Sequence, residues 1–220
     1  MLTFEQKQHL MELLPEFLLM SDTADAAALK GIGAVEAKTA EEVLAAYEII
    51  GNRRGIFYAV PADAELGDLL GKCRFIASSM EELAAVNEAS AQQGVTTMVG
   101  LRLVADGFEG DGITTAQLQG MVHDIKQLKN ISVCGSIVVG NLEGLHGKEL
   151  GKFVRSSYQT AKMMTVILPC SMPYICLEGL LEAAAWNQEV HPETMEDFLT
   201  AANIVGMQNV TAFYADYYIQ

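Results

Sequence analysis

The segment 95–140 constrains the fold more than any other part of the sequence, because it has the order strand, loop, helix, strand. Its first strand is the run 98–105, which is apolar apart from one glycine and Arg102. The loop 106–112 (DGFEGDG) contains the glycines and aspartates that are typical of turns. The apolar run 131–139 is the second strand of the unit.

The helix between these two strands is marked by its capping residues and by the spacing of its apolar residues. Thr114 and Gln117 have the spacing of a capping box. Apolar residues then recur as they do on one face of a helix, at Leu118, Met121, Val122, Ile125 and Leu128. Two apolar strands joined by one helix favour parallel pairing with a right-handed crossover.

The same alternation of apolar runs and helical segments recurs along the whole chain. Thr39 with Glu42, and Ser79 with Glu82, mark the starts of two further helices. We expect strands at residues 17–20, 34–38, 56–60, 75–77, 98–105, 131–139, 166–168 and 210–219. Other helices are expected at residues 2–14, 24–31, 62–71, 148–162, 177–186 and 193–205.

Eight strands that alternate with helices predict a (β/α)8 TIM barrel, here with an extra N-terminal helix. No linker-like tract divides the chain, so we expect residues 1–220 to form a single domain. The alternative architecture is an open, doubly wound sheet. No glycine-rich dinucleotide fingerprint follows the first strand, and this disfavours that alternative.

Composition excludes several classes of partner. Half of the 220 residues are hydrophobic, and the formal net charge is −14. An acidic chain repels phosphate backbones, so we expect no nucleic-acid partner. No apolar run has the length of a membrane span or of a signal peptide core, so we expect a cytoplasmic protein with no membrane contact. The four cysteines form no C-x-x-C motif, and we expect free buried thiols.

In a barrel of this type, the functional site lies at the C-terminal ends of the strands. The candidates are the polar residues at or just beyond the expected strand ends. They are Ser21, Asp22, Glu36, Lys38, Ser78, Ser79, Arg102, Asp106, Asn141, Glu143, Cys170, Ser171, Tyr214 and Asp216. The four histidines are isolated in sequence, so we expect no metal site.

Glu36 and Lys38 are two residues apart on one expected strand, so they share a face. Their neighbours Val35 and Ala37 would face the helices, which places the charged pair inside the barrel. A buried lysine loses its proton easily and forms Schiff bases. The alternative interpretation is a structural ion pair within the barrel.

Arg102 lies in the middle of an apolar strand and also has two interpretations. In the first, its planar guanidinium binds a carboxylate or phosphate of a ligand through two parallel hydrogen bonds. Alternatively, it neutralises Glu36 or Asp106 within the barrel, because an unpaired mid-strand arginine is costly. Ser171 follows the expected seventh strand, where many barrels bind a phosphate, but Pro169 and Pro173 remove two N–H donors there.

Four short motifs give the sequence a resemblance to a known family. They are residues 33–42 (GAVEAKTAEE), residues 75–83 (FIASSMEEL), residues 99–113 with their final Gly-Ile, and residues 133–139 with Gly135. These segments resemble the second, fourth, fifth and sixth units of the fold-type III pyridoxal-phosphate barrels. That family includes the alanine racemase N-terminal domain, amino-acid decarboxylase barrels and single-domain pyridoxal-phosphate homeostasis proteins. The resemblance implies the same barrel over nearly the whole chain.

The departures from this family concern its chemistry. The family's cofactor lysine ends the first strand, but here Met20, Ser21 and Asp22 occupy that place, and the nearest lysine is Lys30. Ser171 keeps the serine expected after the seventh strand, without the accompanying glycine. The arginine and glycine expected around the eighth strand are absent from residues 213–218. We also expect no second domain of the racemase and decarboxylase type.

The sequence therefore predicts a racemase-like barrel that has lost its Schiff-base site and uses no cofactor. Arg102, Lys38, Ser171 and further strand-end residues would bind a small amino-acid-like or carboxylate or phosphate ligand, in a regulatory role. The alternative is a pyridoxal-phosphate-related or Schiff-base enzyme of the amino-acid racemase or decarboxylase type, for which the resemblance would supply the cofactor. In its rebuilt site, Lys38 is the base or Schiff-base residue and Glu36 or Asp106 is its partner. A third hypothesis is a homodimer or partner subunit without a ligand.

Overall fold

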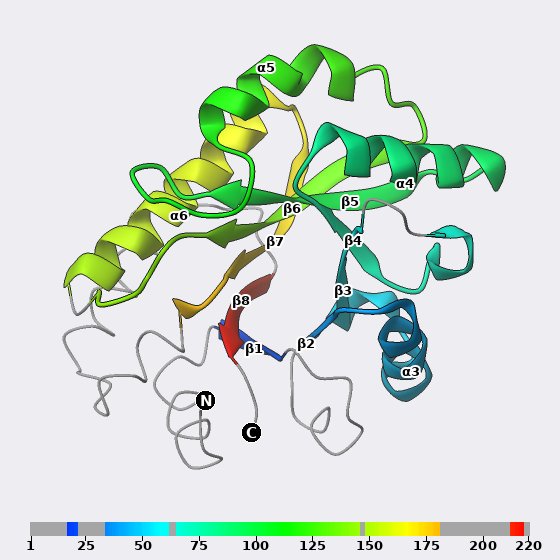
Figure 1. Ribbon diagram of the computed structural model, residues 1–220, viewed down its shortest axis with the longest axis horizontal. Coiled ribbons are helices and arrows are strands. Elements are labelled where there is room, and N and C mark those ends of the chain that lie inside the picture. Colours follow the sequence, from blue (N-terminus) through cyan, green and yellow to red (C-terminus); the bar gives the residue numbers. More distant parts are fainter. Residues whose placement is uncertain (1–16, 22–33, 62–64, 146–147, 181–211, 218–220) are drawn as a thin grey trace.

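The computed structural model describes residues 17–21, 34–61, 65–145, 148–180 and 212–217 (Figure 1). Six parallel strands form a curled sheet, paired in chain order. They are β2 (Ala34–Ala37), β3 (Ile56–Ala59), β4 (Arg74–Ala77), β5 (Thr97–Val104), β6 (Ile131–Val139) and β7 (Ser171–Leu177). This confirms the predicted α/β class with a parallel sheet.

Two further strands continue the sheet at its ends. β1 (Phe17–Ser21) pairs with β2, and β8 (Ala212–Tyr217) pairs with β7, both in parallel. β1 and β8 also pair with each other, so the strand order is a ring. The helices predicted at residues 2–14, 24–31 and 193–205 lie outside the described residues.

In the described part of the chain, four α-helices cover the outer face of the curled sheet (Figure 1). They are α3 (Ala40–Ile50), α4 (Met80–Gln92), α5 (Thr115–Ile125) and α6 (Lys148–Ile167). The predicted caps begin three of them: the side chains of Thr39, Ser79 and Thr114 each accept a hydrogen bond from the backbone N–H three residues later. Such a bond satisfies one of the free N–H groups at a helix start.

Both faces of the sheet are buried, as expected for parallel strands. The larger core cluster contains residues of both the strands and the helices, for example Val99 of β5, Leu118 of α5 and Phe153 of α6. The smaller cluster contains strand residues only and fills the inside of the curl. Its members are Ala34, Phe57, Ile76, Val104, Ile137, Val139, Tyr174 and Cys176.

Tyr174, in the middle of β7, fills the inside of the sheet, and two glycines make room for it. A Cβ atom at Gly100 or at Gly135 would overlap the Tyr174 side chain. Gly135 also has φ +73°, a conformation that L side chains rarely adopt. Phe57 packs edge-on against the Tyr174 ring at a centroid distance of 5.0 Å, and the Arg74 guanidinium lies 4.6 Å from the ring centre.

Two predicted elements were wrong. The apolar residues 166–168, predicted as the seventh strand, belong to the end of α6, where the Leu168 N–H donates to the Met164 carbonyl. The strand is instead β7, five residues later, and its Leu177 was predicted to begin a helix. Pro169 ends the helical turn, because a proline lacks the N–H that would continue it.

The predicted helix at residues 62–71 is the second error. Among the residues described there, the only helical element is the 3-10 turn η2 (Gly67–Leu69). Gly67 and Gly71 lower the stability of a longer helix, and Gly71 adopts φ +80°.

All four cysteines are free thiols, as predicted. Burial raises the pKa of Cys73 to about 12 and that of Cys170 to about 11, so both thiols stay protonated at neutral pH. No helix of the described chain is both long and apolar enough to cross a bilayer.

The packing of Tyr174 leads to a first prediction. We expect Gly135→Ala to lower the free energy of unfolding by about 3 kcal/mol, because it combines an unfavourable φ with overlap of the ring. Urea denaturation measures the change. Gly94→Ala is the matched control, because Gly94 has φ +66° but nothing within 4 Å of an added Cβ. This control should lose only about 1 kcal/mol; equal losses in both variants would contradict the packing role of Gly135.

Candidate functional site

The candidate site is built on an ion pair at the carboxyl edge of the curled sheet. Arg102 is near the end of β5, and Glu178 directly follows β7. The Arg102 Nη2 lies 2.5 Å from the Glu178 Oε1, and the two side chains are 19% and 21% exposed. The site therefore joins side chains that are 76 residues apart in sequence.

Further contacts fix the Arg102 side chain. Its Nε donates a hydrogen bond of 2.8 Å to the backbone carbonyl of Asp111, in the loop between β5 and α5. Burial by itself lowers the pKa of Arg102, but the charge and hydrogen bond of Glu178 more than offset this effect. Glu36 and the Asp111 carboxylate add to the attraction, so the pKa is raised above its usual value. The arginine is held as a cation among several carboxylates.

Glu178 has one carboxylate oxygen left for another donor. Its Oε2 is buried and accepts no hydrogen bond from any residue that the structure describes. The backbone N–H of Glu178 donates to the Val138 carbonyl of β6, and this bond fixes the position of the Glu178 backbone. A buried acceptor without a partner is unfavourable, and a ligand donor beside it removes that cost.

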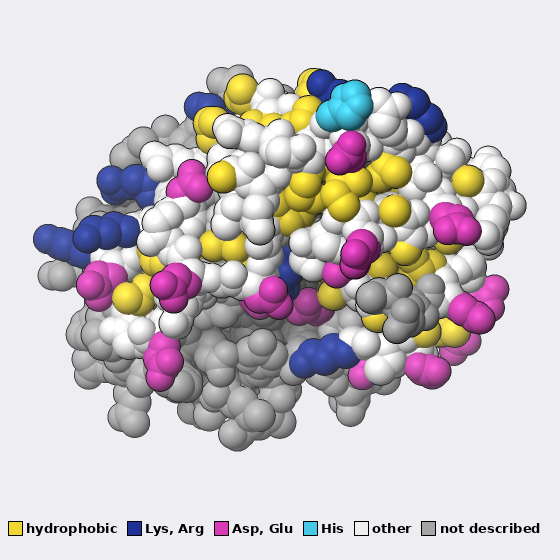
Figure 2. All heavy atoms as spheres, turned by 45° about the horizontal axis from the view of Figure 1, so that its top comes forward, with side chains coloured by type: hydrophobic (Ala, Val, Ile, Leu, Met, Phe, Trp, Pro, Cys, Tyr) yellow, Lys and Arg dark blue, Asp and Glu magenta, His cyan; other side chains and the backbone are white. Residues whose placement is uncertain are grey.

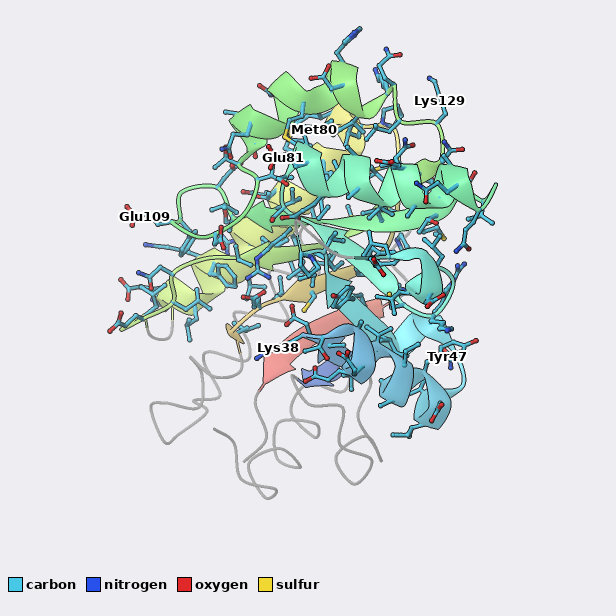
Figure 3. All side chains as sticks on the ribbon, turned by 45° about the vertical axis from the view of Figure 1, so that its right-hand side comes forward. Lys38, Tyr47, Met80, Glu81, Glu109 and Lys129 are labelled. Carbon is cyan, nitrogen blue, oxygen red and sulfur yellow. The ribbon has the colours of Figure 1, made fainter. Side chains whose placement is uncertain are left out.

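Glu36 and Lys38 lie at the same edge, but they are not buried together as predicted. Glu36 is half-buried in β2, whereas Lys38 is exposed, so its predicted burial inside the barrel was wrong. β2 ends at Ala37, and the alternation of faces does not continue beyond it. The Lys38 backbone N–H donates to the Glu42 carboxylate, as part of the turn into α3. In Figure 3, Lys38 lies on the edge of the sheet away from Tyr47.

Asp106 is tied into the surrounding helices. Its carboxylate accepts a hydrogen bond of 2.8 Å from the Thr115 hydroxyl at the start of α5. Its backbone N–H donates to the Thr160 Oγ1, and its carbonyl accepts from the Ser156 hydroxyl. These bonds anchor the β5–α5 loop to α6, so Asp106 positions the loop that holds Arg102.

Asn141 joins two loops at the same edge. Its backbone N–H donates to the Glu109 carbonyl, and its side-chain Oδ1 accepts from the Glu143 N–H. The exposed Asn141 side chain therefore bonds within its own turn. Figure 3 shows Glu109 at the outer end of the neighbouring loop.

The remaining predicted residues lie in β7, β1 and β8 or outside the described part of the chain. Ser171 is the first residue of β7, at the opposite edge of the sheet, so its predicted place at a strand end was wrong. Ser21 is the last residue of β1. Tyr214 is the third residue of β8, and its backbone pairs with Cys176 of β7. Asp22 lies outside the described residues.

None of the eight described strands contains a lysine, the residue type that would hold pyridoxal phosphate covalently. Two described lysines follow strands at the carboxyl edge. Lys38 comes directly after β2, and Lys148 begins α6, which follows β6; both are exposed. No group of three or more metal-ligating side chains occurs in the described residues. The polar groups that remain at the edge are suited to non-covalent binding.

Glu178 is the residue that the sequence analysis missed. Because the seventh strand was placed too early, Glu178 fell into a predicted helix. The signal that identifies it is the run Met172 to Leu177, which is apolar apart from Pro173 and Tyr174 and ends directly before a Glu-Gly pair. A carboxylate directly after a buried strand is a candidate site residue by the same rule that selected Arg102.

No family model and no curated protein matches the sequence. Solved structures do match the fold. The arginine decarboxylase of Paramecium bursaria Chlorella virus has a TM-score of 0.72 at 14% identity. The ornithine decarboxylase of Entamoeba histolytica has a TM-score of 0.73 at 12% identity. PipY of Synechococcus elongatus, whose structure was determined without pyridoxal phosphate, has a TM-score of 0.60 at 12% identity.

These similarities define the class of fold. The chain aligns over 97% and 96% of its length with the two decarboxylases but spans only 60% and 61% of theirs. With PipY, 96% of each chain is covered. The structural neighbours are thus the pyridoxal-phosphate-type barrels that the sequence resembles. At these identities the similarity shows the fold alone.

The ion pair leads to a second prediction. We expect Glu178→Gln to lower the free energy of unfolding by about 1–3 kcal/mol, because Arg102 then lacks its counter-charge in a half-buried place. Chemical denaturation measures the change. The exposed Glu143 supplies the matched control, and Glu143→Gln should change stability by less than about 0.5 kcal/mol.

A double-mutant cycle isolates the pair itself. Arg102→Met should be as damaging as Glu178→Gln, and the double variant should lose less than the sum of the two. Strictly additive losses would show that the two side chains do not stabilise each other.

Proposed function

We propose that the chain is a single-domain, cytoplasmic (β/α)8 barrel that binds a small amino-acid-like ligand without covalent catalysis. The binding site would lie at the carboxyl edge of the sheet, and the role would be regulatory. The observation that carries this proposal is the half-buried pair of Arg102 and Glu178. The fold also supports the proposal, because nearly the whole chain is similar to the barrels of decarboxylases and of PipY.

The chemistry of the pair suits a ligand with both an ammonium and a carboxylate group. Arg102 has several N–H donors, of which Asp111 and Glu178 engage two. The others are available for a ligand carboxylate in a planar, charge-assisted contact. The buried Oε2 of Glu178 is available for a ligand ammonium. An amino acid supplies both partners within one small molecule.

The balance of charge favours an amino acid over a phosphate. One guanidinium faces Glu178, with Glu36 and Asp111 acting on it from further away. Excess negative charge at the edge repels a phosphate and attracts an ammonium group. Of the ligand classes predicted from the sequence, the amino-acid-like class therefore agrees best with these contacts.

The loss of Schiff-base chemistry is part of the same proposal. It is supported by the absence of lysine from all eight strands. A Schiff base needs an amine that reaches the cofactor carbon. Ser21, the last residue of β1, has a hydroxyl group and supplies no such amine.

A third prediction tests the ligand class by thermal denaturation. At about a hundred times its dissociation constant, a specific amino acid should stabilise the fold by about 2.7 kcal/mol, a shift of about 5–10 °C. The panel contains L-amino acids, their N-acetyl forms, the corresponding amines and inorganic phosphate. We expect a shift only from molecules that have both charged groups.

Two variants connect this shift to the pair. Glu178→Gln and Arg102→Met should each weaken ligand binding about ten-fold or more, whereas Glu143→Gln leaves it unchanged. A shift from phosphate alone, or one that survives both variants, would refute the proposed ligand class.

The second candidate function is an enzyme in which Lys38 has taken over the amine role. It is favoured by the position of Lys38 at the carboxyl edge, two residues after the half-buried Glu36. In that case Lys38 would form the Schiff base, with Glu36 or Asp106 as its acid–base partner.

A fourth prediction separates the two candidates. After incubation with pyridoxal phosphate and reduction with borohydride, we expect no stoichiometric adduct on Lys38 by peptide mass spectrometry. Lys38→Arg should leave the amino-acid-induced thermal shift unchanged. One reduced cofactor per chain on Lys38, absent from Lys38→Arg and from a control without borohydride, would establish the enzyme instead.

A further inference from the structure

A groove runs along the outer surface between α3 and α4, where the connection from β3 to β4 carries no α-helix in its described residues. The connections after β2, β4, β5 and β6 each carry an α-helix of 11 to 20 residues. In the described part of the β3–β4 connection, η2 is the only helical element. The groove has a volume of about 660 Å³.

The floor of the groove is apolar and made of small side chains. Ala40 and Leu44 contribute from α3, and Ala85 and Ala89 contribute from α4. Each pair is four residues apart, so each presents one side of its helix to the groove. These four residues are only partly buried and pack against the main core. They form two apolar helix faces with no described α-helix between them.

The rim of the groove is acidic. Glu65, Asp68 and Glu88 line it, and all three are exposed. Its described lining contains no lysine or arginine. Figure 2 shows acidic side chains beside apolar ones towards the right-hand side of the molecule. The whole chain, with these residues included, carries a formal net charge of −14.

We propose that this groove docks a basic amphipathic helix of a partner protein. The alanines that α3 and α4 contribute to the floor let a third helix approach to about 8–10 Å between axes, as packed helices do. The apolar face of the partner would cover Leu44 and the three alanines. Its lysine or arginine residues would lie against the acidic rim, where opposite charges also raise the association rate.

The other occupants agree less well with these observations. A second copy of this chain would bring a net charge of −14 against an acidic rim. A small molecule needs converging polar groups for orientation, and the floor offers mainly methyl groups. This site lies outside the sheet, so it is independent of the ligand proposed for Arg102 and Glu178.

The test uses a fluorescein-labelled, 18-residue model peptide of leucine and lysine that folds as an amphipathic helix. Fluorescence anisotropy measures its binding to the full chain at physiological salt. One pair of variants tests charge: Glu88→Lys in the rim, with Glu149→Lys on α6 as the control of equal charge change. A second pair tests the floor without charge: Ala89→Gln, with exposed Ala116→Gln on α5 as the control.

We expect both groove variants to weaken peptide binding about ten-fold, and both controls to change it less than about two-fold. Circular dichroism melts of all four variants confirm that each is folded. Equal losses in Glu88→Lys and Glu149→Lys would show diffuse attraction to an acidic surface and overturn the proposal. Absence of binding to the native chain would also overturn it. The proposal would also be overturned if sedimentation showed that the native chain is a dimer and that only the groove variants dissociate it.

Discussion

The inside of the curled sheet has to be filled by side chains from the strands themselves, and this constraint organises the molecule. Tyr174 occupies the space at the middle of β7, and Gly100 and Gly135 are small because the ring lies against their backbone. Phe57 and Arg74 pack on the same ring. Side-chain packing around Tyr174 therefore fills the middle of the interior, and the pair of Arg102 and Glu178 lies beyond it, at the carboxyl edge.

At that edge, the sequence identified one half of the central contact. Arg102 stood out because a mid-strand arginine needs a partner, but Glu36 and Asp106 were expected in that role. The structure pairs it with Glu178, and Asp106 bonds instead to Thr115. A partner 76 residues away depends on the register of two strands that are not adjacent in sequence, and no local pattern reports that register.

Much of the fold followed from local signals. The capping residues at Thr39, Ser79 and Thr114 fixed the starts of three helices, because each bond lies within one helical turn. The error at residues 166–168 has a physical cause: a short apolar run is equally suited to a strand and to a buried last turn of a helix. Tertiary packing decided between them, since Met164 and Leu168 are both buried in the same core.

The pairing of β1 with β8 has a consequence for the order in which the chain folds. Phe17 pairs with Phe213, so this contact encloses nearly the whole polypeptide. The turns after β2 and β4 depend instead on residues four positions apart, such as Lys38 with Glu42. Ordering a short segment loses little conformational entropy. Joining the two ends of the chain closes the largest loop and therefore loses the most entropy. We therefore expect assembly to start within single strand–helix units and the seam between the first and last strands to form late.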